Sequence, residues 1–82
     1  MTEDELKNII FSGLRQVAPE SEPATLRPDQ NIRETLDIDS FDFLSFLIAL
    51  NEKLGVEIPE ADYGKLSTLE AMLGYLAPKV AA

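Results

Sequence analysis

The stretch LDIDSFDFLSFLIAL, residues 36–50, places one serine between an acidic segment and a dense apolar run. Asp37 and Asp39 precede Ser40, and apolar residues predominate from Phe41 onward. Such a serine either starts a helix or carries a functional group. The rest of the sequence has to decide between these two roles.

The spacing of this segment predicts a helix that begins at Asp39 or Ser40. Asp39 and Asp42 are three residues apart, as in a helix cap, and an acid near a helix N-terminus is stabilised by about 0.3–1 kcal/mol. Gly55 is a typical C-terminal stop, so the last helical residue is expected at about Leu54. Taken alone, an Asp-Ser pair before an apolar run is more often a cap than a reactive site.

The apolar residues of this helix fall on two faces. A core stripe at helical spacing contains Phe43, Leu47, Leu50 and Leu54, with Phe46 at its edge. A second stripe, about a third of a turn away, contains Phe41, Leu44 and Ile48. Its polar neighbours Asn51 and Glu52 favour a place near the surface. We therefore expect an exposed apolar docking site; the alternative is a helix buried over more than half its circumference.

One further helix is expected before residues 40–54 and one after them. Thr2 and Glu5 have capping-box spacing, and this first helix ends before Pro19. Its apolar stripe consists of Leu6, Ile9, Ile10, Leu14 and Val17. Ser67 and Glu70 form a second predicted capping box. The apolar face of the last helix consists of Leu69, Met72, Leu73 and Leu76.

A long loop, PESEPATLRPDQNIRETL, separates the first and second predicted helices. Three prolines break it, and Leu26, Ile32 and Leu36 are its expected anchors in the core. One short helical turn is expected at 60–65, and no β-type alternation of useful length appears. The sequence thus predicts one all-α domain, residues 1–82: a small four-helix bundle of three main helices and one short helix.

Composition excludes several classes of function. The chain has 82 residues and a net charge of −8, with no cysteine and no histidine. Ser–His and Cys–His catalysis are therefore ruled out, and we expect neither an enzyme nor a metal site. The negative charge opposes binding to nucleic acid or anionic lipid and favours a basic protein partner. No apolar run approaches the length of a membrane span, and the polar, acidic start of the sequence favours a cytoplasmic protein.

The segment DSFDFLSFLIALNEKLGVEIPEADYGKLSTLEAMLGYL resembles the acyl carrier proteins. That family has an Asp-Ser-Leu motif before an amphipathic helix, then an Ile-Pro link, a short third helix and a capped fourth helix. The corresponding features here are Asp39-Ser40-Phe41, Ile58-Pro59 and the final STLEAMLGYL. The resemblance is strong over residues 36–76 and extends to the first helix and long loop by their layout.

The resemblance implies a role for Ser40 that needs no histidine or cysteine. In that family the serine receives 4′-phosphopantetheine from coenzyme A through a Mg²⁺-dependent phosphopantetheinyl transferase. Ser40 would be the attachment site and Asp39 the neighbouring recognition acid. The arm would carry an acyl or aminoacyl cargo as a thioester, and partner enzymes would supply the activation. A monomer is the family's usual state.

The resemblance also implies how partners bind. In that family, acyl-activating ligases, synthases and transferases use basic patches of their own to dock onto the second helix of the carrier, which offers apolar residues surrounded by acids. The corresponding docking residues here are Phe41, Asp42, Leu44, Ile48, Glu52, Glu57 and Glu60. From Glu34 to Asp62 there are eight acids and one base, so the negative charge is concentrated around this helix.

Departures from the family pattern indicate a specialised member. Phe41 stands where leucine is usual, Ser45 and Asn51 are neutral where acids are common, and Lys53 reverses a third charge. We infer a dedicated carrier of a lipid or secondary-metabolite pathway with its own ligase or synthase.

Two further expectations concern the cargo and the rival function. Phe43 and Phe46 are expected to narrow the cavity in which the family shelters acyl chains. The alternative to a carrier is an unmodified helical adaptor that keeps the fold and binds partners through the same apolar stripe.

Overall fold

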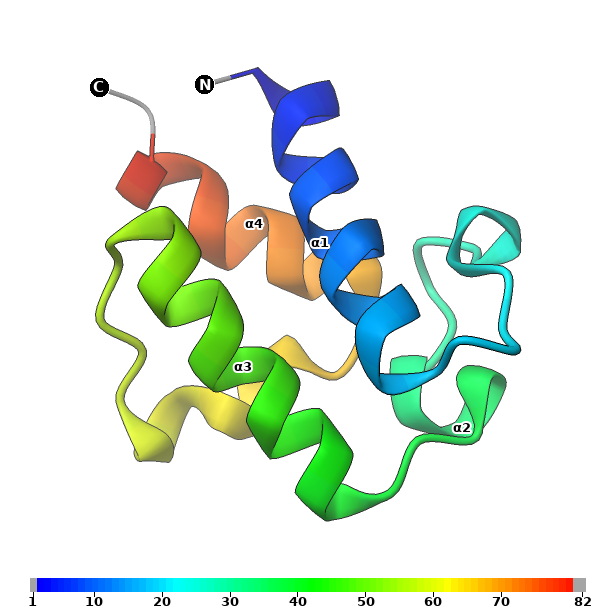
Figure 1. Cartoon of the computed structure of the whole chain (residues 1–82). Helices are drawn as coiled ribbons and strands as arrows, with labels where there is room; N and C mark the ends of the chain where they lie inside the picture. Colours follow the sequence, from blue (N-terminus) through cyan, green and yellow to red (C-terminus); the bar gives the residue numbers. More distant parts are fainter. Residues whose placement is uncertain (1, 81–82) are drawn as a thin grey trace.

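The computed structural model describes residues 2–80, which form a small helical bundle (Figure 1). These residues fold into four α-helices and two 3-10 helices: α1 (Glu3–Val17), η1 (Pro23–Thr25), α2 (Ile32–Leu36), α3 (Ser40–Leu54), η2 (Glu60–Leu66) and α4 (Leu69–Val80). Within residues 2–80 the one β-type contact is an isolated bridge between Asn31 and Thr68. The predicted all-α class is confirmed.

The helix α1 packs against both α3 and α4, and η2 lies against α4 (Figure 1). The core side of α1 is the predicted stripe: its central residues Leu6, Ile10 and Leu14 are buried, and Ile9 and Val17 are partly buried against them. From α4 the core receives Leu69, Met72 and Leu76. A single apolar core thus joins the three long helices.

The predicted ends of α1 and α3 are confirmed. Thr2 Oγ1 accepts a hydrogen bond of 3.1 Å from Glu5 N, which satisfies one of the free amides of the first turn. Gly55 ends α3 in the left-handed region at φ 65°, where a side chain would be strained.

The predicted cap of α4 is wrong by one residue. Thr68, not Ser67, caps this helix: its Oγ1 accepts a hydrogen bond of 3.0 Å from Ala71 N. Ser67 instead follows η2 and is engaged through its backbone, since its carbonyl accepts a 2.9 Å hydrogen bond from Ile32 N. The neighbouring hydroxyl of Thr68 therefore took the role.

The sequence predicts a long loop between α1 and α3, but this segment contains helical structure. It contains η1 and α2, and the carbonyl of Pro28 accepts a 2.9 Å hydrogen bond from Glu70 N at the start of α4. The three predicted anchors, Leu26, Ile32 and Leu36, are all buried. The segment is therefore held to the bundle by apolar contacts and by backbone bonds to the start of α4.

The helix α3 packs closely against α1 at Gly13. Phe46, expected at the edge of the core stripe, is only 1% exposed, and Leu54, expected in the core, is half-buried. A β-carbon added to Gly13 would lie 2.9 Å from Cε1 of Phe46. Phe46 in turn packs against Phe43, with ring centroids 5.8 Å apart. A glycine is thus required where the two helices meet.

We expect Gly13→Ala to destabilise the protein, although alanine is the better helix former. Overpacking a core contact costs about 1–3 kcal/mol, which exceeds the roughly 1 kcal/mol of helix propensity that alanine gains. The matched control is Gly74→Ala in α4, where an added β-carbon meets no atom within 4 Å. This change should raise stability by about 0.5–1 kcal/mol. Urea unfolding followed by circular dichroism measures the stability of both variants. An equal rise in stability for Gly13→Ala and Gly74→Ala would contradict the close contact between Gly13 and Phe46.

Candidate functional site

The start of α3 separates the roles of two adjacent polar residues. Asp39 caps the helix: its Oδ1 accepts a hydrogen bond of 2.8 Å from Asp42 N. Ser40 is the first helical residue, and it is exposed. Within residues 2–80 its hydroxyl has no hydrogen-bond partner, and Asp39 alone performs the capping. Capping therefore does not explain the hydroxyl of Ser40.

A tight turn sets the position of this helix start. The helix α2 ends at Asp37, which takes the left-handed conformation at φ 54°. The carbonyl of Arg33 accepts hydrogen bonds from the amides of Asp37 and Ile38, the latter at 2.9 Å. The Nε of Arg33 also donates to the carbonyl of Ile38, at 3.4 Å. The turn thus fixes both the chain leading into Ser40 and the side chain of Arg33.

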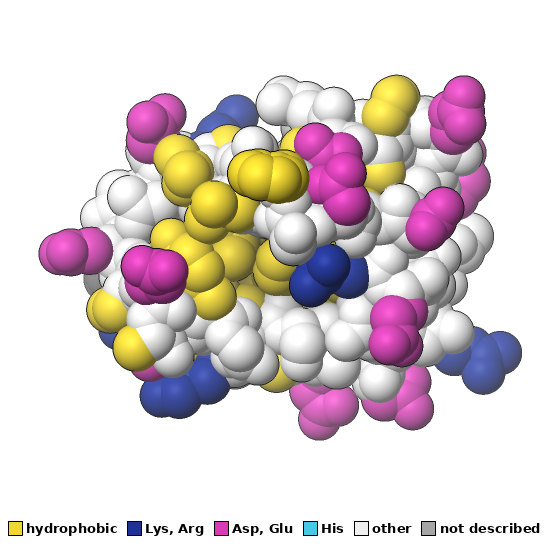
Figure 2. Space-filling view, turned by 90° about the horizontal axis from the view of Figure 1, so that it is seen from below, with side chains coloured by type: hydrophobic (Ala, Val, Ile, Leu, Met, Phe, Trp, Pro, Cys, Tyr) yellow, Lys and Arg dark blue, Asp and Glu magenta, His cyan; other side chains and the backbone are white. Residues whose placement is uncertain are grey.

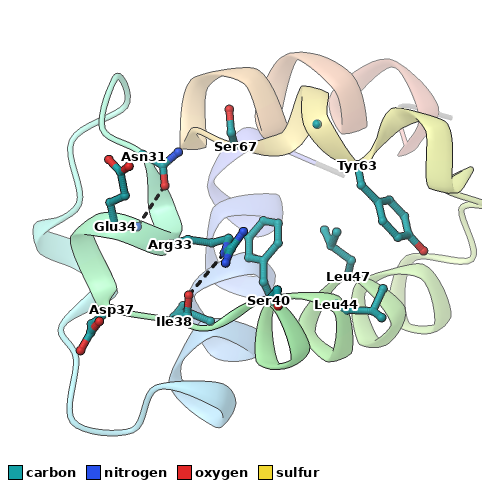
Figure 3. Close-up of a pocket in the computed structure, with 12 residues that line it drawn as sticks. Asn31, Arg33, Glu34, Asp37, Ile38, Ser40, Leu44, Leu47, Tyr63 and Ser67 are labelled. Atoms are coloured by element: carbon teal, nitrogen blue, oxygen red, sulfur yellow. Dashed lines mark hydrogen bonds between the residues drawn. The ribbon is translucent and has the colours of Figure 1, made fainter.

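A pocket of about 610 Å³ opens beside Ser40 (Figure 3). One wall is apolar and belongs to α3, where it consists of Phe43, Leu44 and Leu47. The opposite side is more polar; its lining includes Asn31, Arg33, Tyr63 and Ser67, together with the acids Glu34 and Asp37. The serine hydroxyl, an apolar wall and a cationic side chain therefore meet in one place.

The second stripe of α3 is exposed, as predicted. Phe41 is 81% exposed, Ile48 48% and Leu44 38%, large values for apolar side chains. Figure 2, which views the molecule from below relative to Figure 1, shows hydrophobic side chains gathered on this face with acidic side chains around them. An exposed apolar patch with a charged rim is typical of a protein-binding surface.

The four acids predicted to surround the stripe are all exposed. Asp42 lies in the first turn of α3 and Glu52 near its last turn, about 15 Å apart along the axis. Glu57 follows in the link after α3, and Glu60 begins η2. The acids are therefore spread along the helix and the chain that follows it, and their role in docking stays a prediction.

Asn51 does not belong to this surface. It is half-buried, and its Oδ1 accepts a hydrogen bond of 2.9 Å from Ile58 N. This bond braces the link that brings Val56 and Ile58 into the core. The side chain at this position therefore has a structural role.

Only one of the two phenylalanines expected to narrow a cargo cavity lines the pocket. Phe43 forms part of its apolar wall, whereas Phe46 is packed against Gly13 on the α1 side of the helix. Phe46 therefore does not narrow this pocket, and the expectation that the two rings narrow a cavity for the cargo stays a prediction. Helical spacing identified both rings as inward-facing but did not separate the side toward α1 from the side toward the pocket.

The η2 wall of the pocket is held by a polar contact to α4. The hydroxyl of Tyr75 donates to Asp62 Oδ2 at 2.6 Å, and Lys65 Nζ lies 3.1 Å from Asp62 Oδ1. These two donors, Tyr75 first, lower the pKa of Asp62 below its ordinary value. The same carboxylate raises the pKa of Tyr75.

Among the residues of this pocket that sequence reasoning missed are Asn31, Arg33 and Tyr63. One signal was available, because Asn31 and Glu34 have the spacing of a helix cap. The structure uses it: Asn31 Oδ1 accepts a hydrogen bond of 3.0 Å from Glu34 N. Recognising that cap would have placed α2, and with it Arg33, directly before the serine.

Within residues 2–80 no group of three or more carboxylate, cysteine or histidine side chains is placed to hold a metal ion. None of the helices in this range is both long enough and apolar enough to cross a membrane.

The fold and site define a carrier-type protein: a small helical bundle that presents one free hydroxyl at a helix start beside a mixed pocket. The family defined by a phosphopantetheine attachment site matches residues 12–76. An acyl carrier protein of Thermosynechococcus vestitus is 38% identical over 61 residues, 74% of this chain and 75% of that protein. The chain belongs to the acyl carrier protein family. It is a carrier protein and not an enzyme.

Other relatives agree with this assignment. A meromycolate extension acyl carrier protein of Mycolicibacterium aurum is 30% identical over 70 residues, 82% of this chain and 72% of that protein. The solved structure of an acyl carrier protein from Enterococcus faecalis has a TM-score of 0.72 at 24% identity, covering 95% of this chain and 98% of that one. This structural match supports the fold alone.

Family membership implies a covalently attached 4′-phosphopantetheine group. The residues present fit such a group. The exposed hydroxyl of Ser40 has no partner in the described part of the chain, and the pocket beside it offers both apolar and polar walls to an arm that has methyl, hydroxyl and amide groups.

The contact between Tyr75 and Asp62 makes a prediction about acid stability. Because the folded-state pKa of Asp62 is lowered, its contribution to stability is present above the ordinary value of 3.8 and is lost as pH falls through the lower, folded value. Tyr75→Phe should therefore destabilise the protein near neutral pH, and its difference from wild type should narrow below pH 3.8. Urea unfolding at a series of pH values measures this difference. Tyr63→Phe is the control, since the Tyr63 hydroxyl has no hydrogen-bond partner within residues 2–80. If the stability difference between Tyr63→Phe and wild type narrowed equally at low pH, the role of the Tyr75–Asp62 bond would be refuted.

Proposed function

We propose that Ser40 is the residue that carries 4′-phosphopantetheine, and that the protein presents an acyl or aminoacyl cargo on this arm to its partner enzymes. The single observation that carries the proposal is the division of roles at the start of α3. Asp39 caps the helix, which leaves the exposed hydroxyl of Ser40 free beside the pocket. Membership of a family defined by this attachment supports the same assignment.

The loading step requires little of this chain beyond position. A bond forms between Ser40 Oγ and a phosphorus of coenzyme A, the pyrophosphate bond breaks, and the nucleotide part leaves. The hydroxyl proton goes to the phosphopantetheinyl transferase, because this chain has no histidine or cysteine and no base within residues 2–80 is in hydrogen-bond contact with Ser40. The amides of Ser40 and Phe41 at the helix N-terminus favour the phosphate that results. When bound, the group supplies a thiol that holds cargo as a thioester.

Partner enzymes are proposed to dock on the exposed stripe of Phe41, Leu44 and Ile48. The apolar area supplies contact energy, and the surrounding acids, Asp42 and Glu52 among them, steer a basic patch toward it. The transferase, an acyl-activating ligase or synthase, and acyl transferases would use this one surface in turn.

The pathway proposed is a dedicated one in lipid or secondary metabolism. Phe41 and Ser45 on α3 give this surface a larger apolar side chain and one acid fewer than the family pattern. One relative is named for meromycolate extension, so members of this family do serve specialised lipid synthesis. The cytoplasmic location and the monomeric state stay predictions.

The first prediction from this proposal is covalent loading at Ser40. Wild-type protein incubated with coenzyme A, Mg²⁺ and a promiscuous phosphopantetheinyl transferase should gain the mass of one phosphopantetheine, and Ser40→Ala should gain none. Because Asp39 provides the cap, Ser40→Ala should unfold at nearly the wild-type urea concentration.

A folded wild-type chain that gains no mass, while a known carrier is loaded in parallel, would favour an unmodified adaptor. Phe41→Leu distinguishes this result from simple rejection by the transferase, since leucine is the residue usual in the family. If Phe41→Leu is loaded and the wild type is not, Ser40 keeps its proposed role, and the failure of the wild type to load is due to the side chain of Phe41.

The second prediction concerns docking. Ile48→Ser removes about half of a buried isoleucine contact with a partner, on the order of 1 kcal/mol, so kcat/KM of the transferase should fall about fivefold. Ala49→Ser, on the side of α3 that faces Ile9 of α1, is the matched control and should leave kcat/KM unchanged. Equal effects of the two substitutions would place docking elsewhere.

A further inference from the structure

Arg33 is the one basic residue that lines the pocket beside Ser40, in a region where negative charge predominates. From residue 34 to residue 62 the chain has eight acids and a single base. The field around the serine is therefore unfavourable for a phosphodiester, which is itself an anion. A cation beside Ser40 offsets this repulsion for an anionic group attached to the serine.

The backbone turn holds Arg33 close to the attachment point. Its Nε donates to the carbonyl of Ile38 at 3.4 Å, and Ile38 is only two residues before Ser40. Two extended residues span at most about 7 Å, so the guanidinium is within reach of a group bonded to Ser40 Oγ. The amide of Ile38 also donates to the carbonyl of Arg33, which fixes the geometry from both ends.

The remaining donors of the guanidinium are available. An arginine has five N–H donors, and the bond to Ile38 uses one. Within residues 2–80 no carboxylate lies within 4 Å of Arg33; the ion pair found there joins Lys65 and Asp62. Glu34 and Asp37 also line the pocket, but in Figure 3 Arg33 extends toward its centre whereas their carboxylates point away from that centre. A planar fork of free donors is suited to bind an oxyanion.

We propose that Arg33 binds an oxyanion carried by the loaded protein and thereby draws the arm onto this pocket. The proposal rests on the attachment at Ser40 proposed above. The nearest source of such an oxyanion is the phosphodiester at Ser40, and a carboxylate on the cargo is the other. With its anionic end held by Arg33, the arm lies between the wall of Phe43 and Leu47 and the polar groups of Tyr63 and Ser67.

The test uses the full chain after loading, with ³¹P NMR of the phosphodiester as the readout. Arg33→Gln should shift the ³¹P resonance relative to wild type, and the difference should shrink as NaCl is added. Arg33→Lys keeps the charge but loses the Nε bond to Ile38, so it should restore part of the wild-type shift. Arg27→Gln, an exposed arginine outside the pocket, is the matched control and should leave the resonance in place.

A second arm of the experiment distinguishes the two sources. Protein loaded from succinyl- or butyryl-coenzyme A differs only in a terminal carboxylate. The oxyanion is assigned to the cargo if two results are found together. The Arg33 Nε–H resonance moves with the succinyl form but not with the butyryl form, and Arg33→Gln leaves the ³¹P resonance unchanged. A ³¹P effect that is the same for both cargoes assigns it to the phosphodiester.

Two results would overturn the proposal. One is the absence of both effects in a protein whose mass shows complete loading. The other is a lysine variant that behaves like the glutamine variant, since the effect would then come from the lost bond to Ile38 and not from charge. Failure of the wild-type chain to load at all would count instead against the attachment at Ser40, and the mass spectrum separates that case from these.

Discussion

The packing of α3 against α1 decides which face of α3 is open to other molecules. Phe46 lies so close to Gly13 that a β-carbon does not fit between them, and this contact sets the rotation of α3. With 100° per residue, Phe41 and Ile48 lie roughly opposite Phe46 around the helix axis. The exposed apolar stripe is therefore a consequence of the core, because a helix with apolar residues on two sides buries the side that contains Phe46.

Local signals predicted the parts of the structure that local interactions create. The cap at Asp39 depends on a residue three positions away, and the end of α3 at Gly55 depends on one backbone conformation. The two faces of α3 follow from periodicity, which also indicated that Phe41 and Ile48 are exposed. For the same reason the position of Ser40 as the first helical residue could be read from the sequence before its surroundings were known.

The parts that could not be predicted depend on contacts between distant segments. The helix α2 has only five residues, too few to be stable alone, and it is held by the bond from Ile32 N to the carbonyl of Ser67. The choice of Thr68 over Ser67 as a cap follows from the same contact, which engages the Ser67 backbone. Asn51 resembled a surface residue by spacing, but its partner Ile58 is seven residues away across a turn. Because α2 was missed, Asn31 and Arg33 were missed with it.

The start of α3 has to satisfy two opposed electrostatic requirements. Basic partner enzymes are attracted by acids such as Asp42 and Glu52, whereas a phosphodiester at Ser40 is repelled by them. Distance separates the two effects only for the far acids: at physiological salt interactions between exposed charges are screened beyond about 8 Å, so Glu52 is screened from Ser40 whereas Asp42, two residues away, is not. Arg33, bonded to the carbonyl of Ile38 two residues before the serine, acts within that range and opposes the nearby acids, while acids spread over the whole helix act together on a partner that covers them. One cation in an acidic region can therefore favour the arm at its attachment point and leave the attraction for basic enzymes nearly unchanged.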